Sequence, residues 1–142
     1  MDLETAVTFV RDHRRAVLVT IRGNGRPQLS NVLHDVDADG AIRISITATR
    51  AKYANLVRQP WAALHVTQDD FWAYAVVEGG VTLSAIVQAP DDDAANLLVD
   101  YYRSIRGEHP DWDEYRASLV SEQRVLVRLH PGRAYGMLPE TT

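Results

Sequence analysis

The residues with the clearest chemical potential lie together in residues 45–60, SITATRAKYANLVRQP. Arg50 and Lys52 stand at the start of a predicted short helix. A helix N-terminus already presents unsatisfied N–H groups and about half a unit of positive charge, so cations there are unfavourable unless an anion is bound. The hydroxyls of Thr47 and Thr49 come just before and can donate to the same ligand. The segment therefore predicts a phosphate site, with a solvated pair of basic side chains as the alternative interpretation.

The rest of the sequence offers no recognisable side-chain catalyst. The absence of cysteine excludes disulfides, zinc thiolate sites and thiol nucleophiles. The five histidines are scattered without the spacing of a metal-ligand pair, and no Gly-x-Ser-x-Gly motif is present. We therefore predict neither a catalytic side chain nor a metal site.

The elements that must position this segment are mostly strands. Alternating apolar and β-branched residues predict strands at residues 16–22, 28–36, 42–47, 62–67 and 124–129, and one bent or two short strands at residues 72–87. Gly79-Gly80 marks a bulge or corner there. Helical periodicity predicts helices at residues 2–13, 50–58, 91–105 and 111–119. Because most strands follow one another directly, a closed or nearly closed antiparallel β-barrel with flanking helices fits best.

Composition narrows the class of protein and of ligand. The 142 residues predict a single domain spanning residues 1–142. A formal net charge of −4 argues against general nucleic-acid binding but allows one phosphorylated small molecule. No apolar run approaches the roughly 20 residues of a membrane helix, and the acidic N-terminus is unlike a signal peptide. We expect a cytoplasmic protein that acts on a small molecule away from membranes.

Several segments together resemble the split-barrel family of the pyridoxamine-phosphate oxidases, which bind flavins. A strand ending in threonine is followed by Arg50-x-Lys52, by Asn55-Leu56 and then by Pro60. Residues 25–30 (GRPQLS), 76–81 (VVEGGV) and 128–136 (RLHPGRAYG) are similar to other segments of that family, so the match runs from about residue 2 to residue 136. The resemblance implies a mainly β fold, a six-stranded antiparallel split barrel with flanking helices, and a homodimer with its sites at the interface.

Within that superfamily the chain looks most similar to the small branch that uses the deazaflavin coenzyme F420 in place of FMN. Its short length and the form Arg50-x-Lys52-x-x-Asn55-Leu56 carry this similarity. The longer oxidases carry an extra basic strand segment and a C-terminal Arg/Pro-rich substrate motif, and neither is found. Few other basic residues stand near the motif in the sequence, which gives less support to binding of the coenzyme's oligoglutamate tail.

The resemblance also implies a set of cofactor-binding residues. The ring would lie against Gln28, Ser30 and Asn31, and Trp72 or Tyr74 would cap it or form the partner's wall, unless Trp72 only packs in the core or an interface. The phosphate and ribityl chain would be held by Ser45, Thr47, Thr49, Arg50, Lys52 and Asn55. The resemblance implies hydride transfer from the deazaflavin to a conjugated organic acceptor. Two alternatives stay open, an FMN-dependent oxidase or reductase with the same site and a non-enzymatic flavin- or haem-binding split barrel.

Overall fold

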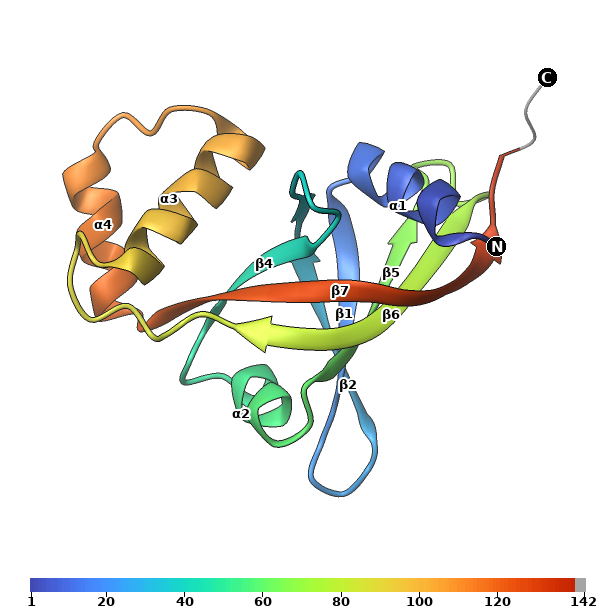
Figure 1. The fold of residues 1–142 in the computed structure, drawn as a ribbon, viewed down its shortest axis with the longest axis horizontal. Coiled ribbons are helices and arrows are strands. Elements are labelled where there is room, and N and C mark those ends of the chain that lie inside the picture. The colour runs from blue at the N-terminus through green and yellow to red at the C-terminus, as the bar shows by residue number, and fades with distance from the viewer. Residues whose placement is uncertain (140–142) are drawn as a thin grey trace.

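A strongly curled antiparallel sheet forms the body of the protein in the computed structural model, which describes residues 1–139 (Figure 1). The strands are β1 (Arg15–Ile21), β2 (Pro27–Leu33), β3 (Asp35–Val36), β4 (Ile42–Thr47), β5 (Trp61–Thr67), β6 (Tyr74–Leu83) and β7 (Arg124–Met137). The helices are α1 (Leu3–Asp12), α2 (Ala51–Arg58), α3 (Asp93–Arg106) and α4 (Trp112–Ser121). The strand order β2-β1-β5-β6-β7-β4-β3 confirms the predicted mainly β, antiparallel split barrel.

The two edges of this sheet belong to one extended stretch of chain. β2 pairs with β1, β3 pairs with β4, and only His34 separates β2 from β3. The segment therefore leaves one edge of the sheet and joins the other, which curls the sheet into a barrel that stays split between β2 and β4. The sequence predicts one strand at residues 28–36 and six strands in all. The sheet has seven because that strand changes partners at His34.

β6 and β7 are long partners with one irregularity. The register shifts between Glu78 and Gly79, and Gly79 lies opposite Pro131, which confirms the predicted bulge at the glycine pair. A Cβ on Gly79 would lie 1.9 Å from the His130 carbonyl oxygen, so only glycine allows this close approach. The prediction that the last strand ends at Leu129 is wrong. Because Pro131 falls at the bulge, where the ladder is already interrupted, β7 continues to Met137.

α1 and α2 close the two ends of the barrel (Figure 1). Asp2 caps α1 by accepting from the Thr5 backbone N–H at 2.8 Å. Val10 of α1 and Leu56 of α2 are fully buried in the main hydrophobic core. Within residues 1–139, no helix has the length and apolar character needed to span a membrane.

α3 and α4 form a hairpin beside the barrel, next to the ends of β4 and β7 (Figure 1). The hairpin packs around a hydrophobic cluster of its own, to which β7 contributes Leu126. Polar contacts tie α3 to the barrel, among them a hydrogen bond that Arg14, next to β1, donates to the Ser104 carbonyl oxygen. The Tyr101 hydroxyl donates to the Leu33 carbonyl at 2.9 Å, and Arg43 of β4 donates to Asp100 at 2.7 Å while also pairing with the buried Asp35.

His34 is buried at the point where the chain changes edges. Its Nε2 lies 2.9 Å from the Val10 carbonyl oxygen, which can only accept, so the proton of the neutral ring is on Nε2. Nδ1 has no hydrogen-bond partner within residues 1–139. Burial lowers the pKa of His34 below its usual 6.5, against opposing effects of the Val10 carbonyl and Asp35.

His34 is therefore protonated less readily in the folded state than in the unfolded chain, where it takes up a proton below about pH 6.5. We expect the free energy of unfolding to be fully retained above that pH and to fall by up to about 1.4 kcal/mol per pH unit as the pH drops below it. Urea denaturation between pH 7 and 5 measures this slope. The His34→Gln variant should show a flatter profile, and the exposed control His130→Gln should keep the wild-type slope. Parallel profiles for wild type and His34→Gln would contradict the assignment.

Candidate functional site

Three cationic side chains meet where β4, β7 and α2 come together. Arg50 and Lys52 stand at the N-terminus of α2, and Arg124 begins β7 opposite Thr47 of β4. They line a cavity of about 270 Å³ together with Ser45, Ile46 and Thr47. The cationic cluster, as we call these three side chains, therefore draws on segments more than 70 residues apart in the sequence.

Two of the three cations in the cluster, Arg50 and Lys52, have no acidic partner within residues 1–139. Lys52 is half-buried and has neither an ion pair nor a hydrogen bond in the described part of the chain. Burial, with Arg50 and Arg124 as like charges, lowers the pKa of Lys52. Arg50 is the N-cap of α2, yet its side chain makes no capping hydrogen bond. Only Arg124 has an acidic partner, Glu122 at 3.1 Å. Such a site is suited to an anion, which would relieve the repulsion and satisfy the helix N–H groups.

A groove continues from the cluster along the split of the barrel. This cavity of about 380 Å³ shares Ser45, Lys52 and Arg124 with the cluster. Its other lining residues come from β2 and the helical hairpin and are Asn31, Val32, Leu33, Tyr101, Tyr102, Arg106, Tyr115, Leu119 and Glu122. An elongated ligand with a phosphate at one end and a planar aromatic portion at the other fits this split groove.

Most of the residues predicted to bind the phosphate line one cavity, and the others lie outside it. Ser45, Thr47, Arg50 and Lys52 line the cluster cavity. Thr49 is exposed and lines none of the cavities described here.

Asn55 of α2 is buried and lines neither the cluster cavity nor the split groove. Its Nδ2 donates to the Thr20 hydroxyl at 3.1 Å and lies 3.4 Å from Gln28 Oε1. Through these contacts Asn55 links α2 to β1 and β2.

The predicted ring residues of β2 fall on two faces of the strand. Gln28 and Ser30 lie opposite Thr20 and Leu18, whose side chains are buried, so they face the interior of the barrel. Asn31 points to the outer face and lines the split groove. Because successive residues of a strand point to opposite faces, the sequence alone could have predicted that Asn31 faces away from Gln28 and Ser30.

Trp72 lies on the turn between β5 and β6 and is 82% exposed. The neighbouring Phe71 is 83% exposed and has a φ of 74°, which is unusual for a bulky residue. Together with His65, Tyr74 and Met137 they border a cavity of about 520 Å³ on the outer face of the sheet. That cavity shares no lining residue with the cationic cluster.

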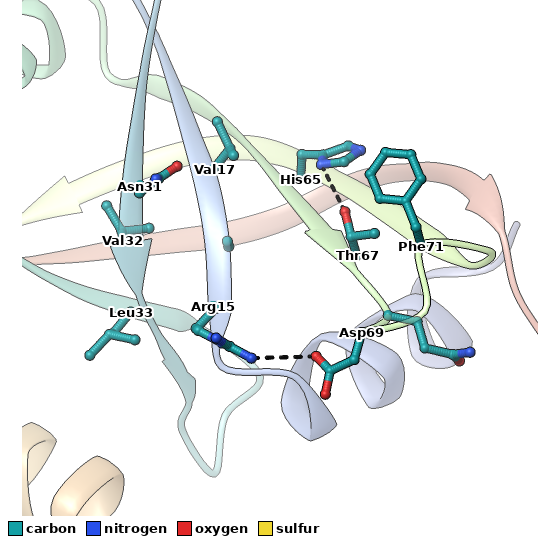
Figure 2. A pocket seen from close by; sticks show the side chains of 11 residues that line it. Arg15, Val17, Asn31, Val32, Leu33, His65, Thr67, Asp69 and Phe71 are labelled. Carbon is teal, nitrogen blue, oxygen red and sulfur yellow. Dashed lines mark hydrogen bonds and ion pairs between the residues drawn. The ribbon is translucent and has the colours of Figure 1, made fainter.

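A further cavity on the outer face, of about 510 Å³, adjoins the split groove (Figure 2). Asn31, Val32 and Leu33 border both spaces. Arg15 and Asp69 form an exposed ion pair at its rim, 3.5 Å apart. The remaining lining residues are Ala16, Val17, His65, Thr67, Gln68 and Phe71.

Comparison with known proteins agrees with this arrangement. The family model described as pyridoxamine 5'-phosphate oxidase matches residues 3–138. The chain belongs to the pyridoxamine 5'-phosphate oxidase family. The match covers the barrel strands, the cationic cluster and the helical hairpin alike.

Solved structures with the same fold bind different groups, as their names state. One described as an F420 reductase has 22% sequence identity and a TM-score of 0.67, over 90% of this chain and 94% of that one. HutZ, the haem storage protein of Vibrio cholerae, has 16% identity and a TM-score of 0.69, over 96% of each chain. A pyridoxamine 5'-phosphate oxidase-related FMN-binding protein of Nostoc punctiforme has 18% identity and a TM-score of 0.62, over 94% of this chain and 81% of that one. At these identities the likeness shows the fold alone.

The charge balance of the cluster leads to a prediction for Lys52. We expect Lys52→Met to weaken binding of a phosphate-bearing cofactor about tenfold to a hundredfold, because a charge-assisted hydrogen bond contributes about 1.5–3 kcal/mol. The thermal midpoint of unfolding should not fall, because the substitution removes a cation from a helix N-terminus and from two like charges. Fluorescence titration and thermal melts measure both. The matched control Arg22→Met, in the exposed turn after β1, should change neither, and equal affinity in Lys52→Met and wild type would contradict the site.

Proposed function

We propose that the protein is an oxidoreductase that uses coenzyme F420 to transfer hydride to a conjugated organic substrate. The observation that carries the proposal is the half-buried Lys52, which lies near Arg50 and Arg124 at the N-terminus of α2 and has no acidic partner in the described residues 1–139. A cofactor phosphate supplies the missing negative charge. The Arg-x-Lys motif and the match of the family model support a flavin-type cofactor.

The residues present fit such a cofactor. Arg50, Lys52 and Arg124 would hold its phosphate, with hydroxyls from Ser45 and Thr47. The tyrosine-lined split groove would take the ring and exclude water from it. When bound, the deazaflavin supplies the hydride chemistry, and the protein supplies position and electrostatics.

One further cation favours F420 over FMN. Arg106 lines the split groove and forms no ion pair within residues 1–139. FMN carries one anionic group, its phosphate, whereas F420 carries carboxylates beyond the phosphate. Arg106 is not among the residues assigned to the phosphate, and its positive charge would attract those carboxylates.

Cofactor titration tests the choice. We expect micromolar or tighter binding of F420, weaker binding of FMN, and reduced F420 that persists in air until an acceptor is added. Deazaflavin and flavin fluorescence measure the two affinities under identical conditions. Tight FMN binding without F420 binding would replace the proposal by an FMN-dependent oxidase or reductase.

A haem-binding protein is the second candidate. The observation in its favour is His65, an imidazole that borders the cavities on the outer face and offers an axial ligand. Haem titration distinguishes the haem-binding function from the F420-dependent one. A Soret band that shifts on addition of haem to wild type, and not to His65→Phe, would favour the haem-binding function.

We further propose that the outer face of the sheet joins a second copy of the chain. This face carries the partly exposed Leu29, Tyr135 and Met137, together with Phe71 and Trp72. A monomer seldom exposes so many large apolar side chains on one face. Charges of both signs border the same face at Arg15, Asp69, Glu78 and Arg133, so two copies would not bring only like charges together there.

Replacing Leu29 tests this interface. Leu29 is 62% exposed, so Leu29→Asp should leave the fold intact while placing a carboxylate in an apolar interface. We expect at least a tenfold weaker dimer, since burial of a leucine side chain is worth about 1.5–3 kcal/mol. Sedimentation velocity across a concentration series measures the association. Val57→Asp, a comparably exposed position on α2, is the control, and a wild type that stays monomeric at micromolar concentration would contradict the interface.

A further inference from the structure

His65 occupies the centre of the outer face of the sheet. In β5 it lies opposite Val17 of β1 and Val76 of β6, so its side chain stands on the face that these strands share. It lines the cavity of Figure 2 and also the two neighbouring cavities on that face. It is thus the titratable group common to all three.

Two contacts fix the orientation of this imidazole. Nδ1 lies 3.4 Å from the Thr67 hydroxyl, and the ring stacks on Tyr74 with centroids 5.4 Å apart and an interplanar angle of 29°. No hydrogen bond within residues 1–139 uses Nε2. In Figure 2 the ring nitrogen that is not bonded to Thr67 lies on the side of Phe71, which also lines the cavity. The ring is held at one nitrogen and leaves the other available to a ligand.

The cavity of His65 adjoins the proposed cofactor groove. Asn31, Val32 and Leu33 at the end of β2 border both. A ring held in the groove along β2 would therefore have a substrate in the cavity as its neighbour. The apolar walls formed by Val17 and Phe71 suit an organic molecule. The cavity is open to solvent in one chain, since Phe71 is 83% exposed, and the second copy proposed above would cover it.

We propose that His65 is a catalytic residue that donates the proton completing substrate reduction, and that the cavity takes a conjugated carbonyl compound. This inference rests on the proposed function. The hydride and its electron pair form a new C–H bond at the β-carbon, and the π pair of the C=C bond shifts to leave negative charge on the carbonyl oxygen. The Nε2–H bond of the protonated imidazole breaks as an O–H bond forms, giving an enol that relaxes to the ketone. The substrate gains the two electrons that the reduced cofactor loses, and the neutral imidazole recovers its proton from water.

Imidazole is suited to this step because it can carry and release a proton near neutral pH. Arg15 of β1 and Asp69 form an ion pair with each other, so neither is free to donate the proton in place of His65. The other charged or titratable groups on this face are Asp70 in the turn, Glu78 and Tyr74 of β6, and Arg133 and Tyr135 of β7.

Binding of an enolate mimic tests the role without turnover. The probe is p-nitrophenol, whose absorbance reports whether it is bound as the phenolate, added to protein loaded with whichever cofactor, F420 or FMN, it binds. We expect His65→Phe, which keeps a ring to stack on Tyr74, to bind the phenolate about tenfold or more weakly than wild type. Cofactor affinity should stay unchanged, and the control His130→Phe should behave like wild type.

Turnover gives a second readout, with 2-cyclohexen-1-one and menadione as acceptors. We expect the rate of His65→Phe to be at least about a hundredfold lower than the wild-type rate, while its affinity for the cofactor is unchanged. Equal phenolate binding by wild type and His65→Phe in a protein that binds its cofactor would overturn the role of His65 and leave the proposed function standing. Failure to bind either cofactor would overturn both.

Discussion

One change of partner in the extended segment at residues 27–36 determines the form of this barrel. The segment pairs with β1 as far as Leu33 and with β4 from Asp35 onward, so the two edges of the sheet are covalently joined. The buried His34 and the Asp35–Arg43 ion pair hold the crossing in place. β2 pairs with β1 along one edge, and no strand in residues 1–139 pairs with its other edge, so a gap remains between β2 and β4. The split groove is the direct consequence of that gap.

The electrostatics of the cluster show how a site can be built at a cost to the fold. Arg50 and Lys52 are unfavourable neighbours of a helix N-terminus, and Arg124 adds a third positive charge. The large buried core and the capping carboxylates Asp2, Asp92 and Asp111 stabilise the rest of the structure. The barrel can therefore tolerate local repulsion that becomes favourable only when an anion arrives.

The sequence predicted the fold class, and it predicted that Arg50 and Lys52 stand at a helix start, because both depend on local patterns; binding of a phosphate there stays a prediction. Alternation identified the strands, and the cations at a helix start identified Arg50 and Lys52. Arg124 was missed because the β4–β7 register brings it to Thr47 from far along the chain, with no local signal. His65 was missed for a similar reason, since only the packing of β1, β5 and β6 places a scattered histidine among cavities. Strand periodicity could have separated Asn31 from Gln28 and Ser30.

The helical hairpin shares few contacts with the barrel. α3 and α4 pack around a hydrophobic cluster separate from the main core, to which β7 contributes Leu126, and Arg14, Arg43 and Tyr101 provide polar ties to α3. Segments with few shared contacts exchange their amide hydrogens through partial unfolding rather than through global unfolding. We therefore expect the hairpin to open more readily than the barrel, so that the width of the groove that it walls fluctuates. A planar ring can enter such a groove sideways, whereas a rigid channel would have to admit it end-on.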